Sequence, residues 1–131
     1  MDHALHYGEC LANGAVETLH ARVDAEGIPW SPHPVYAGVW VKHLVCGAET
    51  GGRASCHLVR VEPGCSLASH VHEQQLELHE VVVGSGQALV QGKAMAYAPG
   101  VVAVIPQGVH HEVLASADGL WLRATFAPAL K

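Results

Sequence analysis

The chain has few basic residues and no long apolar segment. Lysine and arginine together number seven among 131 residues, they are scattered along the chain, and the net charge is −5. Binding to nucleic-acid phosphates needs clustered cations, so a nucleic-acid partner is not expected. Apolar runs such as Val101–Ile105 fall far short of the roughly 20 residues that a membrane helix needs, so no membrane partner is expected either.

The sequence also shows no secretion signal in its first residues and no closely spaced pair of cysteines. The first residues, Met1–Ala4, show no basic region followed by an apolar core, so we expect no secretion signal. The four cysteines are Cys10, Cys46, Cys56 and Cys65, and none belongs to a Cys-x-x-Cys pair. This usage predicts free thiols in a cytoplasmic protein.

Aromatic side chains are scarce, so small and β-branched residues must form the core. Half of the residues are hydrophobic, but only seven are aromatic. Fourteen glycines and seven prolines divide the chain into short segments, as an all-β domain requires. No long pattern of period 3.6 predicts a sizeable helix. Residues 1–20 are the nearest candidate, and Gly8 and Gly14 interrupt them.

Turn signals divide the chain into an arm and a run of strands. Residues 1–35 are predicted to be an extended arm, because three prolines within residues 29–34 exclude a regular helix or a central strand there. Residues 36–131 are predicted to form one β-domain, a sandwich or a barrel, because turn signals recur every 8–12 residues. The predicted strands span residues 38–45, 54–61, 77–83, 87–91, 93–97, 101–105, 111–115 and 120–126.

The spacing of three histidines and a glutamate predicts a mononuclear metal site. Side chains two residues apart on a strand point to the same face, so His70 and His72 are expected to face one way. Glu77 has the opposite parity, and the polar residues 73–75 are a suitable place for the irregularity that would bring it to that face. His111, from a distant strand, would complete the cluster.

Other residues near the glutamate are alternative ligands. The chain holds eleven histidines, so some clustering arises by chance, and Gln74, Gln75, His79 and Glu80 could each replace Glu77. Three imidazoles and a carboxylate suit Fe(II), Mn(II), Co(II), Ni(II) or Zn(II), with positions left open for water or substrate. The ligand set does not choose among these metals. We predict one divalent transition metal per chain.

Two motifs in the chain resemble the signatures of the cupin superfamily. Residues 64–84 satisfy the pattern G-x5-H-x-H-x4-E-x6-G, and residues 100–111 satisfy G-x5-P-x-G-x2-H. The six-residue gap to Gly84 favours Glu77 as the fourth ligand. The resemblance covers residues 38–127 and implies a double-stranded β-helix with the metal in its mouth. One departure is Ala115, where the second motif often has asparagine.

Three further residues are candidates for chemistry beside the metal. His57 shares the parity of the nearby valines, so it is predicted to face the interior, either as a proton carrier or as a hydrogen-bonded core residue. His79 faces the same way as Glu77 and is a candidate to support the ligands or contact substrate. Arg123, on the last strand, could clamp a substrate carboxylate, although a solvated arginine is the alternative.

A partner copy of the chain is also predicted. The segment Val101–Ile105 is apolar on both faces, whereas a strand in a monomer needs only one dry face. We therefore predict a homodimer formed through this strand or the arm, with coverage by a loop of the same chain as the alternative.

Three functions from different classes follow from the resemblance. The first is a metal-dependent enzyme acting on a small molecule, of dioxygenase, isomerase or lyase type. A sugar acid or other carboxylate is a possible substrate, because the ending Phe126-Ala127-Pro128 resembles the tail of some sugar-acid cupins. The second is a ligand-binding or sensor module. The third is a barrel whose metal is purely structural.

Overall fold

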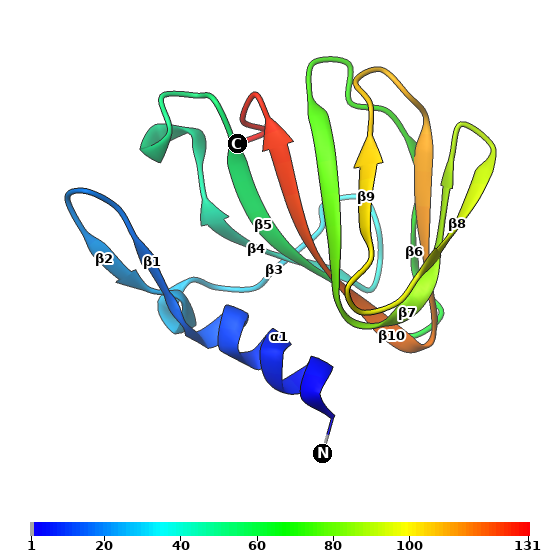
Figure 1. Ribbon diagram of the computed structural model, residues 1–131, viewed down its shortest axis with the longest axis horizontal. Helices are drawn as coiled ribbons and strands as arrows, with labels where there is room; N and C mark the ends of the chain where they lie inside the picture. Colours follow the sequence, from blue (N-terminus) through cyan, green and yellow to red (C-terminus); the bar gives the residue numbers. More distant parts are fainter. Residues whose placement is uncertain (1) are drawn as a thin grey trace.

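Strands account for most of the computed structural model, which describes residues 2–131 (Figure 1). The elements are α1 (His3–Asn13), β1 (Ala15–Glu17), β2 (Arg22–Asp24), η1 (Ala25–Gly27), β3 (Ser31–Pro32), β4 (Val39–Val45), η2 (Gly47–Glu49), β5 (Ser55–Val61), β6 (Ser66–His70), β7 (Leu76–Val90), β8 (Lys93–Tyr97), β9 (Val102–Ile105) and β10 (His111–Ala127).

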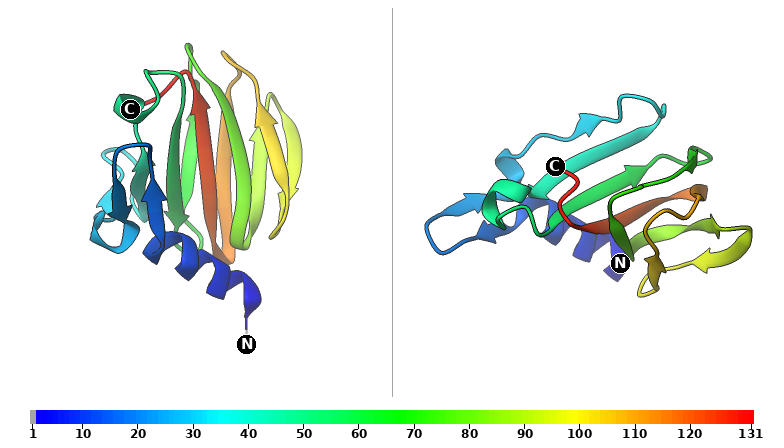
Figure 2. Two further views of the ribbon diagram at one scale, coloured as in Figure 1. Left: turned by 60° about the vertical axis from the view of Figure 1, so that its left-hand side comes forward. Right: turned by 90° about the horizontal axis from the view of Figure 1, so that it is seen from above.

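Two long strands, β7 and β10, connect the two layers of the domain. Residues 111–115 of β10 pair with residues 86–90 of β7, and residues 120–127 pair with residues 76–84. One layer therefore has the order β3-β4-β5-β10-β7-β9, and the other has the order β6-β10-β7-β8. This arrangement is the predicted double-stranded β-helix, and its sheet order does not close on itself (Figure 2).

The change of layer depends on a close approach between two backbones. Gly84 has a φ of +78°, and a Cβ atom there would lie 2.0 Å from the carbonyl oxygen of Gly119. Only glycine fits this contact, which explains the closing glycine of the first motif. Because the strands bend here and continue, the segments predicted as separate strands on either side form single long ones.

The core lies between the two layers and is made mostly of aliphatic side chains. Alternate residues of each strand point inward, as the period of two requires. Its largest buried members include Tyr97, Ile105, Leu120 and Leu122.

The N-terminal segment differs from the predicted extended arm. Residues 3–13 form α1. Asp2 caps its N-terminus, because the Asp2 carboxylate accepts hydrogen bonds from the backbone N–H groups of residues 4 and 5. Gly8 is buried, and a Cβ atom there would lie 2.5 Å from Val83 Cγ2 and 3.0 Å from the Trp121 ring. The glycine taken as an interruption is the point at which the helix packs closely against the outside of the sheet.

The rest of this segment is also held against the sheet. The buried Nζ of Lys42 donates hydrogen bonds of 2.7 Å to the carbonyl oxygens of Ala12 and Ala25. The guanidinium of Arg60 lies 4.5 Å from the ring centroid of Trp30. No helix among the described residues is long and apolar enough to cross a bilayer.

Candidate metal centre

The predicted ligands come from three places in the chain that meet at one end of the fold. His70 is the last residue of β6, and His111 is the first residue of β10. His72 lies beyond β6, in the irregular segment 71–75, and Glu77 lies near the start of β7. This segment accommodates the change of parity between His72 and Glu77 that the sequence requires.

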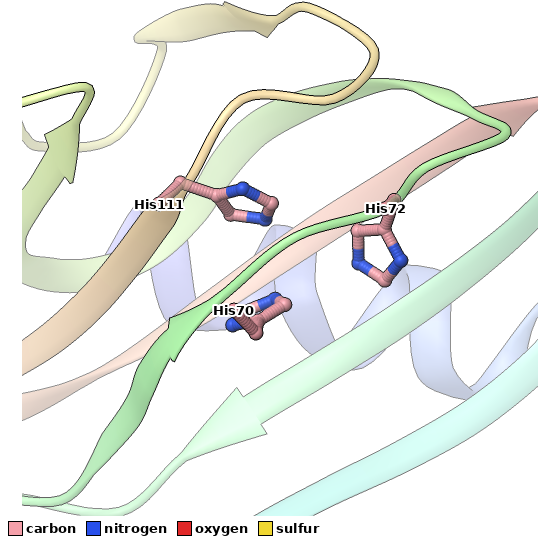
Figure 3. Close-up of side chains that lie close together, drawn as sticks. All are labelled: His70, His72 and His111. Carbon is pink, nitrogen blue, oxygen red and sulfur yellow. The ribbon is translucent and has the colours of Figure 1, made fainter.

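The three imidazoles converge (Figure 3). One ring nitrogen from each of His70, His72 and His111 lies within 4.8 Å of the others. The ring centroids of His70 and His111 are 4.2 Å apart, and that of His72 lies 5.1 Å and 5.5 Å from them. This separation lets one metal ion accept a bond from all three rings.

Backbone carbonyls orient two of these rings. His70 Nδ1–H donates to the carbonyl oxygen of Ala68 at 2.7 Å, and His111 Nδ1–H donates to that of Val109 at 2.9 Å. Because a carbonyl oxygen only accepts, the hydrogen of each neutral ring must lie on Nδ1. The Nε2 atom of each neutral ring therefore carries a lone pair that is available to a cation.

The Glu77 carboxylate lies beside these lone pairs. Its Oε1 is 3.1 Å from His111 Nε2 and 3.7 Å from His72 Nε2. Among the described residues, Glu77 Oε1 and His111 Nε2 are buried without a hydrogen-bond partner. A proton between them would satisfy this pair but would not engage the Nε2 of His70. A metal ion would satisfy all of these atoms, so the residues fit a metal.

The protonation states of three of the four candidate ligands also match those of metal ligands. Burial alone raises the pKa of the Glu77 carboxyl, but the neighbouring rings of His111 and His79 more than offset it, so the pKa lies well below its ordinary value. Burial lowers the pKa of His70 and of His72. Burial also acts to lower the pKa of His111, but Glu77 raises it overall. An ionised carboxylate beside two neutral imidazoles is the state that metal binding needs.

A buried relay fixes the other oxygen of the carboxylate. His79 Nε2 lies 2.7 Å from Glu77 Oε2, and its Nδ1 lies 2.8 Å from the hydroxyl of Tyr97. An ionised carboxylate must accept, so the hydrogen of His79 lies on Nε2 and the Tyr97 hydroxyl donates to Nδ1. Oε2 is thereby occupied, and Oε1 is the atom left for a cation.

The cluster opens into a cavity of about 620 Å³. His70, His72 and Glu77 line one part of it, and Phe126 lies against the ring of His72 with centroids 5.0 Å apart. The volume is within the range of small-molecule sites. Apolar residues form much of the remaining wall, among them Val41, Val59, Leu67 and Ala124.

Comparison with known proteins agrees with this geometry. A family model described as the ChrR cupin-like domain matches residues 18–127. The chain belongs to this cupin family. The match begins inside the segment predicted as an arm, so in this cupin the family's domain includes part of that segment.

Solved structures similar to this cupin share its fold at low sequence identity. An RmlC-like cupin from Shewanella frigidimarina is 19% identical, with a TM-score of 0.72 over 89% of this chain and 96% of that chain. A predicted oxalate decarboxylase from Thermotoga maritima is 22% identical, with a TM-score of 0.70 over 79% and 95%. KdgF from a Halomonas species is 21% identical, with a TM-score of 0.67 over 76% and 86%. No curated protein is similar enough in sequence to match.

Of the other residues predicted to act beside the metal, His57 lies at the cavity and Arg123 does not. His57 is buried and lines the cavity, and its two nitrogens lie 2.8 Å from His43 Nδ1 and 2.9 Å from Ser55 Oγ. Burial, then the charges of His43 and Lys131, lower its pKa to about 4. Because both nitrogens are engaged, His57 reaches a ligand only through His43.

Arg123 does not reach the cavity, so the predicted clamp is corrected. Its neighbours Ala124 and Phe126 line the cavity, and alternation along β10 puts Arg123 on the opposite face. There Arg123 Nη2 lies 2.6 Å from Glu80 Oε1. That carboxylate, the largest cause, raises the pKa of Arg123. The arginine forms an ion pair on the outer face.

Two residues that the sequence analysis did not single out complete the arrangement. His43 lies on β4 opposite His57 in the register of β4 and β5. It shares the parity of Val39 and Val41, so alternation along the predicted strand 38–45 would have placed it on the inner face. Tyr97 ends β8 and had no such signal, because its role depends on which strand β8 pairs with.

Proposed function

We propose that this cupin is a metal-dependent enzyme that acts on a small organic molecule. The observation that carries the proposal is the convergence of imidazole lone pairs and an unpartnered carboxylate oxygen beside a cavity of about 620 Å³. A structural metal needs a closed site, whereas a catalytic one needs room for a substrate. The cavity supplies that room.

Four side chains would hold one divalent transition metal, namely His70, His72, Glu77 and His111. A metal bound there acts as a Lewis acid that polarises a substrate oxygen. The imidazole and carboxylate donors suit iron, manganese, cobalt, nickel or zinc. The work of the surrounding residues is to keep Glu77 ionised and oriented, and to provide an apolar wall that displaces water from the substrate.

The proposed roles of the other two histidines differ. The Nε2–H of His79 is directed at Glu77, so we assign His79 to positioning that carboxylate. His57 is hydrogen-bonded to His43, so a proton that leaves or reaches the substrate on this side would pass through His43. The fold is shared by proteins named as a predicted oxalate decarboxylase and as the polyketide cyclase RemF from Streptomyces resistomycificus. Such neighbours support small-molecule chemistry and select no substrate.

The test changes single ligands and measures metal and turnover together. His70→Ala and His111→Ala are each expected to lose bound metal, because the three remaining donors hold a cation much more weakly. The matched control is His110→Ala, whose side chain is exposed beside His111. Elemental analysis is made on protein purified without added metal, followed by a substrate screen that includes oxygen uptake.

We expect metal and turnover in the wild type and the control, and neither in the two ligand variants. Turnover that survives in a metal-free variant would contradict the proposed function. Tight binding of a small molecule without turnover in metal-loaded wild type would favour the sensor function instead.

A further inference from the structure

A second polar group lies in the cavity, away from the candidate metal ligands. His43 and His57 face each other across β4 and β5, with their Nδ1 atoms 2.8 Å apart. His57 Nε2 is 2.9 Å from Ser55 Oγ, which also accepts a hydrogen bond of 2.9 Å from the backbone N–H of Leu130. Both histidines line the cavity, and Ser55 is buried behind them.

The hydrogens along this chain can be assigned from donors and acceptors. The hydroxyl of Ser55 already accepts from Leu130, and among the described residues its own hydrogen has His57 Nε2 as its acceptor. The hydrogen of His57 then lies on Nδ1 and is donated to Nδ1 of His43. The hydrogen of His43 must lie on Nε2, so His43 offers the cavity a donor.

A positive charge accompanies this donor. Lys131 lines the same cavity, and after burial its charge is a further cause that lowers the pKa of His43. The one acidic side chain among the described residues that line the cavity is Glu77, at the candidate metal ligands. The part of the cavity near His43 therefore presents a neutral N–H and the ammonium of Lys131, while the terminal carboxylate of Lys131 accepts a hydrogen bond from the backbone N–H of Gly47. The N–H and the ammonium together suit an anionic oxygen.

Phe126 separates this part of the cavity from the metal ligands. Its ring centroid lies 5.7 Å from that of His57 and 5.0 Å from that of His72. A molecule that reaches from one polar group to the other must pass this ring and the aliphatic wall. The cavity thus matches a ligand with an apolar middle and an oxygen group at each end.

We propose that His43 and Lys131 form a carboxylate-binding subsite, with His57 and Ser55 as positioning residues that keep the His43 hydrogen on Nε2. The ligand class is an organic acid with an apolar body whose second oxygen group reaches His70, His72 and Glu77. This assignment deepens the proposed function. The contact of the second oxygen group rests on the metal proposed there, whereas the subsite itself requires only that the cavity receives a small molecule.

Calorimetric titration with hexanoate and hexanamide tests the subsite, because these probes share an apolar body and differ in charge. Wild type is expected to bind hexanoate more tightly than hexanamide. His43→Leu and Lys131→Gln should each weaken hexanoate binding roughly tenfold, since hydrogen bonds to charged groups are the stronger ones. His43→Gln keeps a donor and should restore part of the affinity. Lys93→Gln, an equal charge change on an exposed residue of β8, is the control.

All titrations are made on protein as purified and again after treatment with a chelator, with metal content measured in each sample. Hexanoate binding that is no tighter than hexanamide binding in wild type, or that is equal in wild type, His43→Leu and Lys131→Gln, overturns the subsite. If the protein never binds metal but still binds hexanoate more tightly than hexanamide, the result would contradict the proposed function and support the subsite. Lys131→Gln changes an exposed residue, so its result does not depend on whether His43→Leu folds.

Discussion

The hydroxyl of Tyr97 donates to Nδ1 of His79 and so stabilises the tautomer whose Nε2–H orients Glu77. Tyr97→Phe removes that donor and keeps the buried ring. We expect metal affinity to fall about tenfold, because residues that orient metal ligands typically contribute that much. Competition with a coloured chelator measures the affinity. Tyr7→Phe, at an exposed position on α1, is the control. Unchanged affinity in Tyr97→Phe would show that Glu77 keeps its orientation without the relay.

His57 makes folding stability depend on pH. Its pKa falls from 6.5 to about 4 in the folded protein, chiefly through burial and then the charge of His43. Between these values the unfolded chain binds a proton that the folded chain does not, so the free energy of unfolding decreases as the pH is lowered from 6.5 to about 4. The loss should approach about 2 kcal/mol. Urea denaturation across this range should show a smaller decrease for His57→Gln, and parallel curves would refute the assignment.

Lys42 joins the N-terminal elements to the sheet through two carbonyl oxygens. Lys42→Met would leave both carbonyls unsatisfied and should lower the free energy of unfolding by about 2–3 kcal/mol. Hydrogen exchange should accelerate in α1 and η1 before it does in β10. Lys93→Met, at an exposed lysine on β8, should change neither quantity. Uniform acceleration over the whole chain would show that α1 and the sheet unfold as one unit.

The alternation of inward and outward residues, together with the turn signals, predicted most of the strands. The elements that it missed or divided have physical reasons. The strand predicted at residues 93–97 has the observed bounds, and that at 38–45 begins one residue early. The helix α1 escaped prediction because its stability depends on Gly8 packing against Trp121, a contact between distant parts of the chain. The breaks predicted near Gly84 are bends within a strand, because β7 keeps its pairing with β10 on both sides of them.

At the scale of the whole molecule, the motif spacing predicted which histidines meet, because each lies at the end of a strand or in the loop beside one. The role of His43 could not be predicted in the same way, since its contact with His57 depends on the register between two strands. The prediction for Arg123 was wrong because it too depended on the register between two strands. It pairs with Leu58 in the register of β10 and β5, so it lies on the opposite face from His57.

The predicted homodimer depends on the outer face of β9. Val102 and Val104 are 64% and 56% exposed, and β9 is hydrogen-bonded to β7 alone among the described strands. A second copy that covers these valines would remove apolar area from water, so we expect wild type to sediment at twice 13.8 kDa at micromolar concentration. Val104→Asp would bury an unpaired charge in that interface and should weaken association by about 100-fold or more. Leu19→Asp, at a residue that is 92% exposed, should leave the mass unchanged. A wild-type protein that sediments at 13.8 kDa would leave these valines as ordinary exposed residues and would contradict the dimer.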